Sequence, residues 1–239
     1  NPSIDTQSIE MLFLVPRVLT GIFAVIDTFL VYKIAETRYS RKVGFISSTL
    51  FAVLPFTWFL RRMYLDSILL PFLLLSILFS VYYAKRAGCD NHNNNGNNGN
   101  IILILLSGIF LGLAIFTKIP VFTMIPLIVF IILKSGKGKA KDRLKHTGIW
   151  IIPVILIPMI WPAYAMSAGQ LNEWIDGILY QTVRDSDRNL RTSILLIFEF
   201  DPVILLLSGA GIIYSVAKRD YFILLWVFPY LIFQYGIGW

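Results

Sequence analysis

Long apolar runs alternate with short polar intervals along the whole chain. A membrane-spanning helix needs about 20 mostly apolar residues to cross a hydrocarbon core of about 30 Å. By that measure the pattern predicts eight spans, at residues 9–34, 43–60, 65–84, 101–116, 120–133, 148–168, 194–217 and 221–237. The fourth and fifth runs are short and are separated by Lys118, Ile119 and Pro120. Because proline suits the first turn of a new helix, we expect two helices there.

The basic residues of the polar intervals fall on one side of the predicted bundle if the spans simply alternate. They follow the first, third, fifth and seventh spans, at Lys33, Arg38, Arg41, Lys42, Lys85, Arg86, six positions between 134 and 145, Lys218 and Arg219. The positive-inside rule makes this side cytoplasmic. The opposite, outer side then receives residues 61–67, Lys118 and residues 169–193.

Three polar intervals have distinct characters. Residues 85–100 contain an Asn/Gly tract and are predicted to form a disordered cytoplasmic loop, and residues 134–147 form a basic cytoplasmic loop. The outer loop, residues 169–193, carries apolar side chains at helical spacing, namely Leu171, Trp174, Ile175, Ile178 and Leu179. This stripe predicts an amphipathic helix that lies in the plane of the membrane interface.

The composition agrees with a single all-α transmembrane domain over residues 1–239. Hydrophobic residues make up 56% and charged residues 15% of the chain, whereas a soluble domain has about 25% charged residues. The net charge of +7 is explained by orientation in the membrane, so no nucleic-acid partner is expected. The single cysteine, Cys89, excludes an internal disulfide. Gly108 and Gly112 have the spacing that lets membrane helices approach closely.

Residues 61–67 place two arginines and Asp66 between two apolar runs. Ionisable groups at membrane depth usually face a partner or a water-filled cavity and are functional candidates. A simple surface turn, with both arginines reaching to lipid headgroups, is the alternative. If this segment is helical, Arg62 and Asp66 are four residues apart and can pair.

Basic residues gather on the predicted outer side together with Asp66. They are Arg17, Arg61, Arg62, Lys118, Arg184 and Arg188. Guanidinium groups bind phosphate oxygens bidentately and lysine adds a point charge, so this set suits a phosphate or pyrophosphate near headgroup level. Arg61 and Lys118 are the preferred phosphate contacts, followed by Arg17, Arg184 and Arg188.

Four short motifs, in order, resemble the C-type glycosyltransferase (GT-C) superfamily. The similarity is to the branch of protein mannosyltransferases and bacterial aminoarabinose transferases that use polyprenyl- or dolichyl-phosphate sugars. The motifs are Arg-Val-Leu-Thr-Gly at 17–21, the arginine five residues before Asp66-Ser67, Gly-Leu-Ala-Ile-Phe-Thr-Lys at 112–118, and Trp-Pro-Ala-Tyr at 161–164.

The resemblance implies a hexosyltransferase at the outer face of the membrane. It would pass a sugar from a lipid phosphate to a protein hydroxyl or a lipid, with basic residues stabilising the departing phosphate. In the family an aspartate of the first outer loop acts as general base. We read the chain as a fragment truncated at both ends, so we expect that base upstream of it and give Asp66 a supporting role. A divalent cation as cofactor stays open, and a multi-pass protein of a prokaryotic cell membrane is expected.

Two other classes remain as alternatives to a transferase. A transporter or lipid flippase with a basic outer vestibule would show internal repeats and broken helices near the midplane. The sequence shows no repeat, and its charges lie at the rim. A non-catalytic membrane subunit of a larger transferase is the second alternative.

Overall fold

The computed structural model describes residues 6–55, 65–89, 96–135, 140–183 and 190–236. Within these ranges the chain is helical and contains no strand, which confirms the predicted all-α class. In chain order the elements are α1 Thr6–Arg38, α2 Arg41–Val53, α4 Leu65–Cys89, α5 Gly96–Thr117, the 3-10 helix η1 Ile119–Met124, α6 Ile125–Lys134, α7 Ala140–Leu156, α8 Ile160–Ser167, α9 Leu171–Val183, α10 Leu190–Phe200, α11 Pro202–Lys218 and α12 Tyr221–Gly236.

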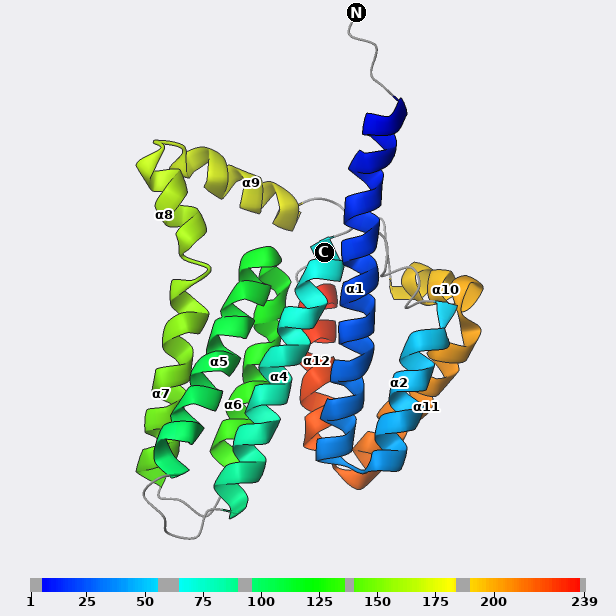
Figure 1. The fold of residues 1–239 in the computed structure, drawn as a ribbon, viewed down its shortest axis with the longest axis vertical. Coiled ribbons are helices and arrows are strands. Elements are labelled where there is room, and N and C mark those ends of the chain that lie inside the picture. The colour runs from blue at the N-terminus through cyan, green and yellow to red at the C-terminus, as the bar shows by residue number, and fades with distance from the viewer. Residues whose placement is uncertain (1–5, 56–64, 90–95, 136–139, 184–189, 237–239) are drawn as a thin grey trace, which may run out of the picture.

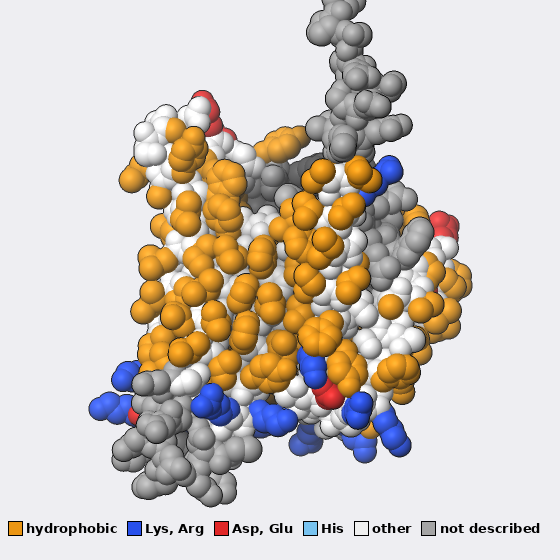
Figure 2. Space-filling model, in the orientation of Figure 1, with side chains coloured by type: hydrophobic (Ala, Val, Ile, Leu, Met, Phe, Trp, Pro, Cys, Tyr) orange, Lys and Arg blue, Asp and Glu red, His pale blue; other side chains and the backbone are white. Residues whose placement is uncertain are grey.

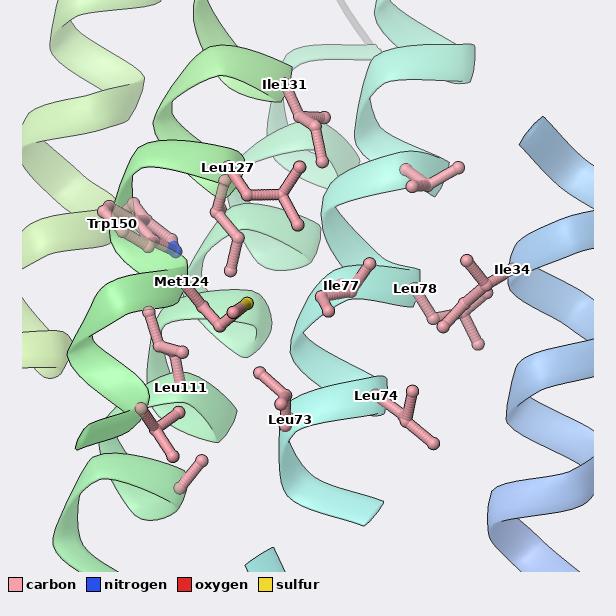
Figure 3. Packing of buried hydrophobic residues seen from close by; sticks show 14 of the residues in the cluster. Ile34, Leu73, Leu74, Ile77, Leu78, Leu111, Met124, Leu127, Ile131 and Trp150 are labelled. Atoms are coloured by element: carbon pink, nitrogen blue, oxygen red, sulfur yellow. The ribbon is translucent and has the colours of Figure 1, made fainter. Parts of the chain in front are cut away.

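The core lies between α1, α4, α5, α6 and α7, which stand side by side (Figure 1). Helix α4 is central, because its two faces pack against different helices. Leu78 meets Ile34 of α1, while Ile77 points toward Met124 and Leu127 on the other side (Figure 3). Both α4 and α5 are apolar nearly all round, as expected of membrane helices that pack on several partners.

Two glycines set the contact between α5 and α7. A Cβ added at Gly108 would lie 2.5 Å from the backbone oxygen of Trp150, and one at Gly112 would lie 2.6 Å from that of Pro153. No larger side chain fits without moving α7, which confirms that this pair permits close helix approach.

The predicted number of eight spans is too high by the criterion of length. Among the described residues, four helices are long and apolar enough to cross a membrane, at Leu14–Arg38, Asp66–Gly88, Gly99–Thr117 and Ala140–Ser167. The apolar helices Ile119–Lys134, Pro202–Lys218 and Tyr221–Gln234 are shorter. Runs of hydrophobicity do not reveal where a helix begins, ends or is interrupted.

The clearest interruption falls inside the run predicted at 194–217. Helix α10 ends at Phe200 and α11 begins at Pro202, so Asp201 separates two helices that pack on each other. Asp201 caps α11, since its carboxylate accepts a hydrogen bond of 3.0 Å from the backbone N–H of Ile204. Aspartate followed by proline is a helix-start signal that the apolar count overlooked.

The loop boundaries also differ from the sequence prediction. Helix α4 continues to Cys89 and α5 begins at Gly96, so only residues 90–95 of the interval predicted at 85–100 lie between helices, outside the described residues. In the same way, α7 begins at Ala140, inside the interval predicted at 134–147. The helix predicted within 169–193 is confirmed as α9, which lies across one end of the bundle (Figure 1).

Candidate functional site at the Asp66 end of the bundle

The two ends of the helix bundle carry different side chains. Lysines and arginines gather at the lower end in Figure 2, where α1, α4, α6 and α11 finish. We call this the basic end. Helix α4 begins at the other end with Asp66 in its first turn, and we call this the Asp66 end. The 20 residues from Asp66 to Arg86 span about 30 Å at 1.5 Å per residue, close to the thickness of a hydrocarbon core.

Asp66 and Lys118 form an ion pair at the Asp66 end. The ammonium Nζ of Lys118 donates a hydrogen bond of 2.8 Å to the carboxylate Oδ1 of Asp66. The two residues are 52 positions apart in the chain, and the antiparallel contact of α4 with α5 brings them together. The sequence predicted that both residues lie on the same side of the bundle, and the structure shows them in direct contact. Pairing of Asp66 with Arg62 lies outside the described residues.

The local sequence fixes the position of Lys118. Helix α5 ends at Thr117, and Lys118 then adopts an extended backbone (φ −154°, ψ 114°) as the residue before η1. Pro120 lies in the first turn of η1, where its missing N–H is no loss and its ring prevents α5 from continuing. Two hydrogen bonds hold the backbone of Lys118, from its N–H to Ala114 and from the N–H of Val121 to its carbonyl. The predicted division into two helices is confirmed.

The pair is accessible to a ligand. Its side chains are 48% exposed for Lys118 and 40% for Asp66. An ion pair with this exposure contributes little to stability, about 0–1 kcal/mol. Lys118 has three N–H donors and, within the described part of the chain, uses one of them on Asp66. The ammonium is thus held in place by Asp66 while donors remain for an anionic ligand.

An aromatic pair stands beside this site. The rings of Phe116, on α5, and Trp161, on α8, stack with their centroids 5.5 Å apart. Trp161 is 50% exposed. The stack connects the end of α5 with α8, which leads into α9 across the same end of the bundle (Figure 1). Half-exposed aromatic rings at this level suit the boundary between lipid and water.

The other predicted site residues are placed less closely or lie outside the described residues. Arg17 is exposed on α1, and its carbonyl accepts a hydrogen bond of 3.0 Å from the hydroxyl of Thr20. No ion pair joins Arg17 to Asp66 within the described part of the chain. Arg61, Arg62, Arg184 and Arg188 fall in the ranges that the structure does not describe.

Two buried aspartates escaped the sequence reasoning as site candidates. Asp27 is 4% exposed on the face of α1 that also carries Leu30 and Ile34, and Asp201 is 2% exposed at the start of α11. Asp201 has a structural role as a helix cap. Asp27 is an ionisable group inside a candidate span, a position that is costly unless the group is used or compensated. Within the described ranges, no three His, Cys, Asp or Glu side chains are grouped to hold a metal ion.

Comparison with known proteins decides the family. The sequence profile described as dolichyl-phosphate-mannose-protein mannosyltransferase matches residues 11–161, more than half of the chain. The chain belongs to this mannosyltransferase family. The GT-C resemblance is thereby confirmed, and the protein is a membrane glycosyltransferase in general type. No curated protein and no solved structure matches it. The matched residues include Arg17, Asp66 and Lys118, whereas Arg184 and Arg188 lie beyond them.

Proposed function

We propose that this protein transfers a hexose from a polyprenyl- or dolichyl-phosphate donor to an acceptor hydroxyl of a protein or lipid, at the Asp66 end of the bundle. Membership of the mannosyltransferase family supports the reaction type. The observation that carries the location is the Asp66–Lys118 pair, an oriented cation at the membrane boundary. Gathering of the basic residues at the other end supports an outward-facing site, by the positive-inside rule.

The charge balance of the reaction explains why a cation is needed. The acceptor oxygen forms a bond to the anomeric carbon as the bond from that carbon to the phosphate oxygen breaks. A base takes the acceptor proton, and the lipid phosphate leaves with one more negative charge than it had in the donor diester. A positioned ammonium is worth most where charge develops in the transition state. Lys118 is proposed for this role, with Arg61 as a second phosphate contact and Arg17, Arg184 and Arg188 as weaker ones.

Asp66 is proposed as the positioning residue for Lys118. Its carboxylate already accepts a hydrogen bond of 2.8 Å from the Lys118 ammonium, a contact that orients the cation. We therefore assign the general base to another acidic residue.

The test uses the full protein reconstituted with a radiolabelled polyprenyl-phosphate hexose. We expect Lys118→Ala and Arg61→Ala each to lower kcat/KM tenfold or more, about 1.4 kcal/mol of transition-state stabilisation. Lys42→Ala, which removes a cation from the basic end, serves as the control and should retain full turnover. If the wild-type protein moved the lipid across the bilayer and never released its sugar, a flippase would replace the transferase. If turnover were unchanged in both variants, the proposed phosphate contacts would be refuted, whereas the proposed transfer reaction would stand.

A further inference from the structure

The basic end of the bundle contains a pocket that the proposed transfer reaction does not use. It has a volume of about 380 Å³ and lies between the ends of α1, α4 and α6 and the start of α12. Along α4, the 19 residues from Asp66 to Lys85 place it about 30 Å from the Asp66 end. Its lining consists of three cations, five apolar residues and the hydroxyl-bearing residues Thr37 and Ser135.

Three cations from three helices line the pocket. They are Arg38 at the end of α1, Lys85 on α4 and Lys134 at the end of α6, and none of the described lining residues is acidic. Two of them are oriented by aromatic rings. Lys134 lies 5.2 Å from the ring centroid of Phe130, and Arg38 lies 5.5 Å from that of Phe222. Lys85 makes no ion pair within the described residues.

Nearby negative charges offset only part of this positive charge. Asp220 approaches Arg38 at 4.0 Å and also accepts a hydrogen bond of 2.6 Å from the hydroxyl of Tyr39. Burial of the phenol and the carboxylate of Asp220 both raise the pKa of Tyr39, so Tyr39 adds no charge of its own. Helices α1 and α6 end here and α12 begins here, so their dipoles together amount to about half a negative charge. Within the described residues, no carboxylate forms an ion pair with Lys85 or Lys134.

Apart from Thr37 and Ser135, the remainder of the lining is apolar, and it indicates the kind of ligand. Val81, Ala84, Phe130, Ile131 and Phe222 form this part. A soluble phosphate ion would gain from the cations but would lose hydration against these side chains. A phospholipid would gain from both surfaces, because its phosphate lies where spans end and its chains lie against apolar side chains. Basic pockets between helices on the positive side of a membrane are suited to anionic headgroups.

We propose that this pocket binds the phosphate headgroup of an anionic phospholipid, separately from the donor lipid at the Asp66 end. Arg38, Lys85 and Lys134 contact the phosphate, and the apolar residues beneath them contact the start of the acyl chains. The bound lipid joins the ends of α1, α4, α6 and α12, four helices from distant parts of the sequence. The proposed lipid site rests only on residues at the basic end. It therefore does not depend on the proposed transfer reaction.

The experiment measures retained lipid on the full protein. Wild type is purified from nanodiscs of phosphatidylcholine containing a minor fraction of phosphatidylglycerol, and the bound phospholipids are counted by native mass spectrometry. We expect retained phosphatidylglycerol in wild type and about a tenfold weaker retention in the double variant Lys85→Gln/Lys134→Gln, which removes two of the three cations. The double variant Lys85→Arg/Lys134→Arg keeps both charges and should retain the lipid.

The matched control is Lys141→Gln/Lys145→Gln. These two lysines are exposed in the first turns of α7, at the same end of the bundle, but they do not line the pocket. Equal loss of lipid in the control and in Lys85→Gln/Lys134→Gln would overturn the proposal in favour of a diffuse surface charge. It would also be overturned if wild type preferred no anionic lipid, or if excess inorganic phosphate displaced the lipid completely, since the ligand would then be a soluble phosphate.

Discussion

Helices α4 and α1 are similarly hydrophobic but have different surroundings. The most apolar 18-residue stretches of α4 and α1 have mean hydropathy values of 2.0 and 1.8. Of the α4 stretch 61% is buried, but of the α1 stretch only 11%. Helix α4 packs against α1, α5 and α6, whereas α1 presents side chains such as Val25, Phe29 and Ile22 on its outer surface. Hydropathy therefore reports that a helix belongs in a membrane and does not report whether it faces protein or lipid.

Small polar residues distinguish the two helices where hydropathy does not. On the α4–α5 contact, Ser76 donates a hydrogen bond of 2.7 Å to the carbonyl of Ser107, and Ser107 donates one of 2.9 Å to the carbonyl of Ser76. Both serines are buried. In lipid, helices associate through close packing and such hydrogen bonds, because the hydrophobic effect no longer drives them together.

The same contact also bears on the proposed site. Asp66 lies in the first turn of α4 and Lys118 directly follows α5, so the geometry of the ion pair depends on how these two helices are held. A rigid pair of helices can position a cation more precisely than a loop can. The contrast with α1 therefore yields predictions that separate packed from lipid-facing positions, beginning with the largest expected effect.

The largest effect is expected at the glycines of α5. Gly108→Val places side-chain atoms where even a Cβ would lie 2.5 Å from the Trp150 carbonyl, and we expect a loss of about 3 kcal/mol in unfolding free energy. Reversible unfolding in mixed micelles measures this. Gly21→Val on α1 is the control, because nothing lies within 4 Å of an added Cβ there. Similar losses at both positions would contradict the distinction between the two helices.

The second effect concerns the ion pair. Asp66→Ala should lower kcat/KM about tenfold, about 1.4 kcal/mol, because Lys118 loses the carboxylate that orients it. Steady-state assays of Asp66→Ala, Lys118→Ala and the double variant complete a mutant cycle. The double variant should be scarcely worse than Lys118→Ala, since Asp66 acts through Lys118. Additive losses would show that Asp66 contacts the substrate independently.

A smaller effect is expected from the serine pair. Ser76→Ala removes the hydrogen bond to Ser107 and should cost about 0.6 kcal/mol of unfolding free energy, the average for interhelical hydrogen bonds in membranes. Ser208→Ala provides a comparison on α11, where the hydroxyl is exposed and bonds only within its own helix, to Leu205. The same unfolding assay should detect no change there. A larger loss at Ser208 than at Ser76 would contradict the view that the hydrogen bond between α4 and α5 stabilises the fold.

The smallest effect is expected on the outer surface of α1. Val25 is 72% exposed, so Val25→Ala in a bilayer should change the unfolding free energy by less than about 0.5 kcal/mol. Leu74→Ala, at a position 2% exposed in α4, should cost about 2 kcal/mol in the same assay. A large loss at Val25 would indicate that this surface of α1 packs against protein in the membrane.

Much of the fold could be predicted from local signals. The apolar runs gave the helical class, Pro120 gave the start of a second helix after Lys118, and the spacing of Leu171, Trp174 and Ile178 gave α9. The number of spans could not be predicted in the same way. Asp201 interrupts an apolar run with a cap, and one aspartate changes a hydropathy average too little to reveal the break.

Two of the predicted site residues, Asp66 and Lys118, were expected on one side of the bundle, but their direct contact could not be predicted. Alternation of spans placed Asp66 and Lys118 on one side, and the family motifs singled out both. That they touch depends on the register of α4 against α5, and this register is set by packing across residues such as Ser76 and Ser107. The spacing of four suggested only Arg62 as a partner for Asp66, a pairing that lies outside the described residues. Sequence spacing reveals neighbours on one helix and not those across two.

The sequence by itself therefore determined that the chain is a helical membrane protein, which end of it is basic and which family it belongs to, because hydropathy, charge and short motifs are local properties. The tertiary structure decided which similarly apolar helices form the core, which cation pairs with Asp66 and that Arg38, Lys85 and Lys134 surround one pocket. These depend on contacts between residues tens of positions apart, and such contacts follow from the packing of helices against one another.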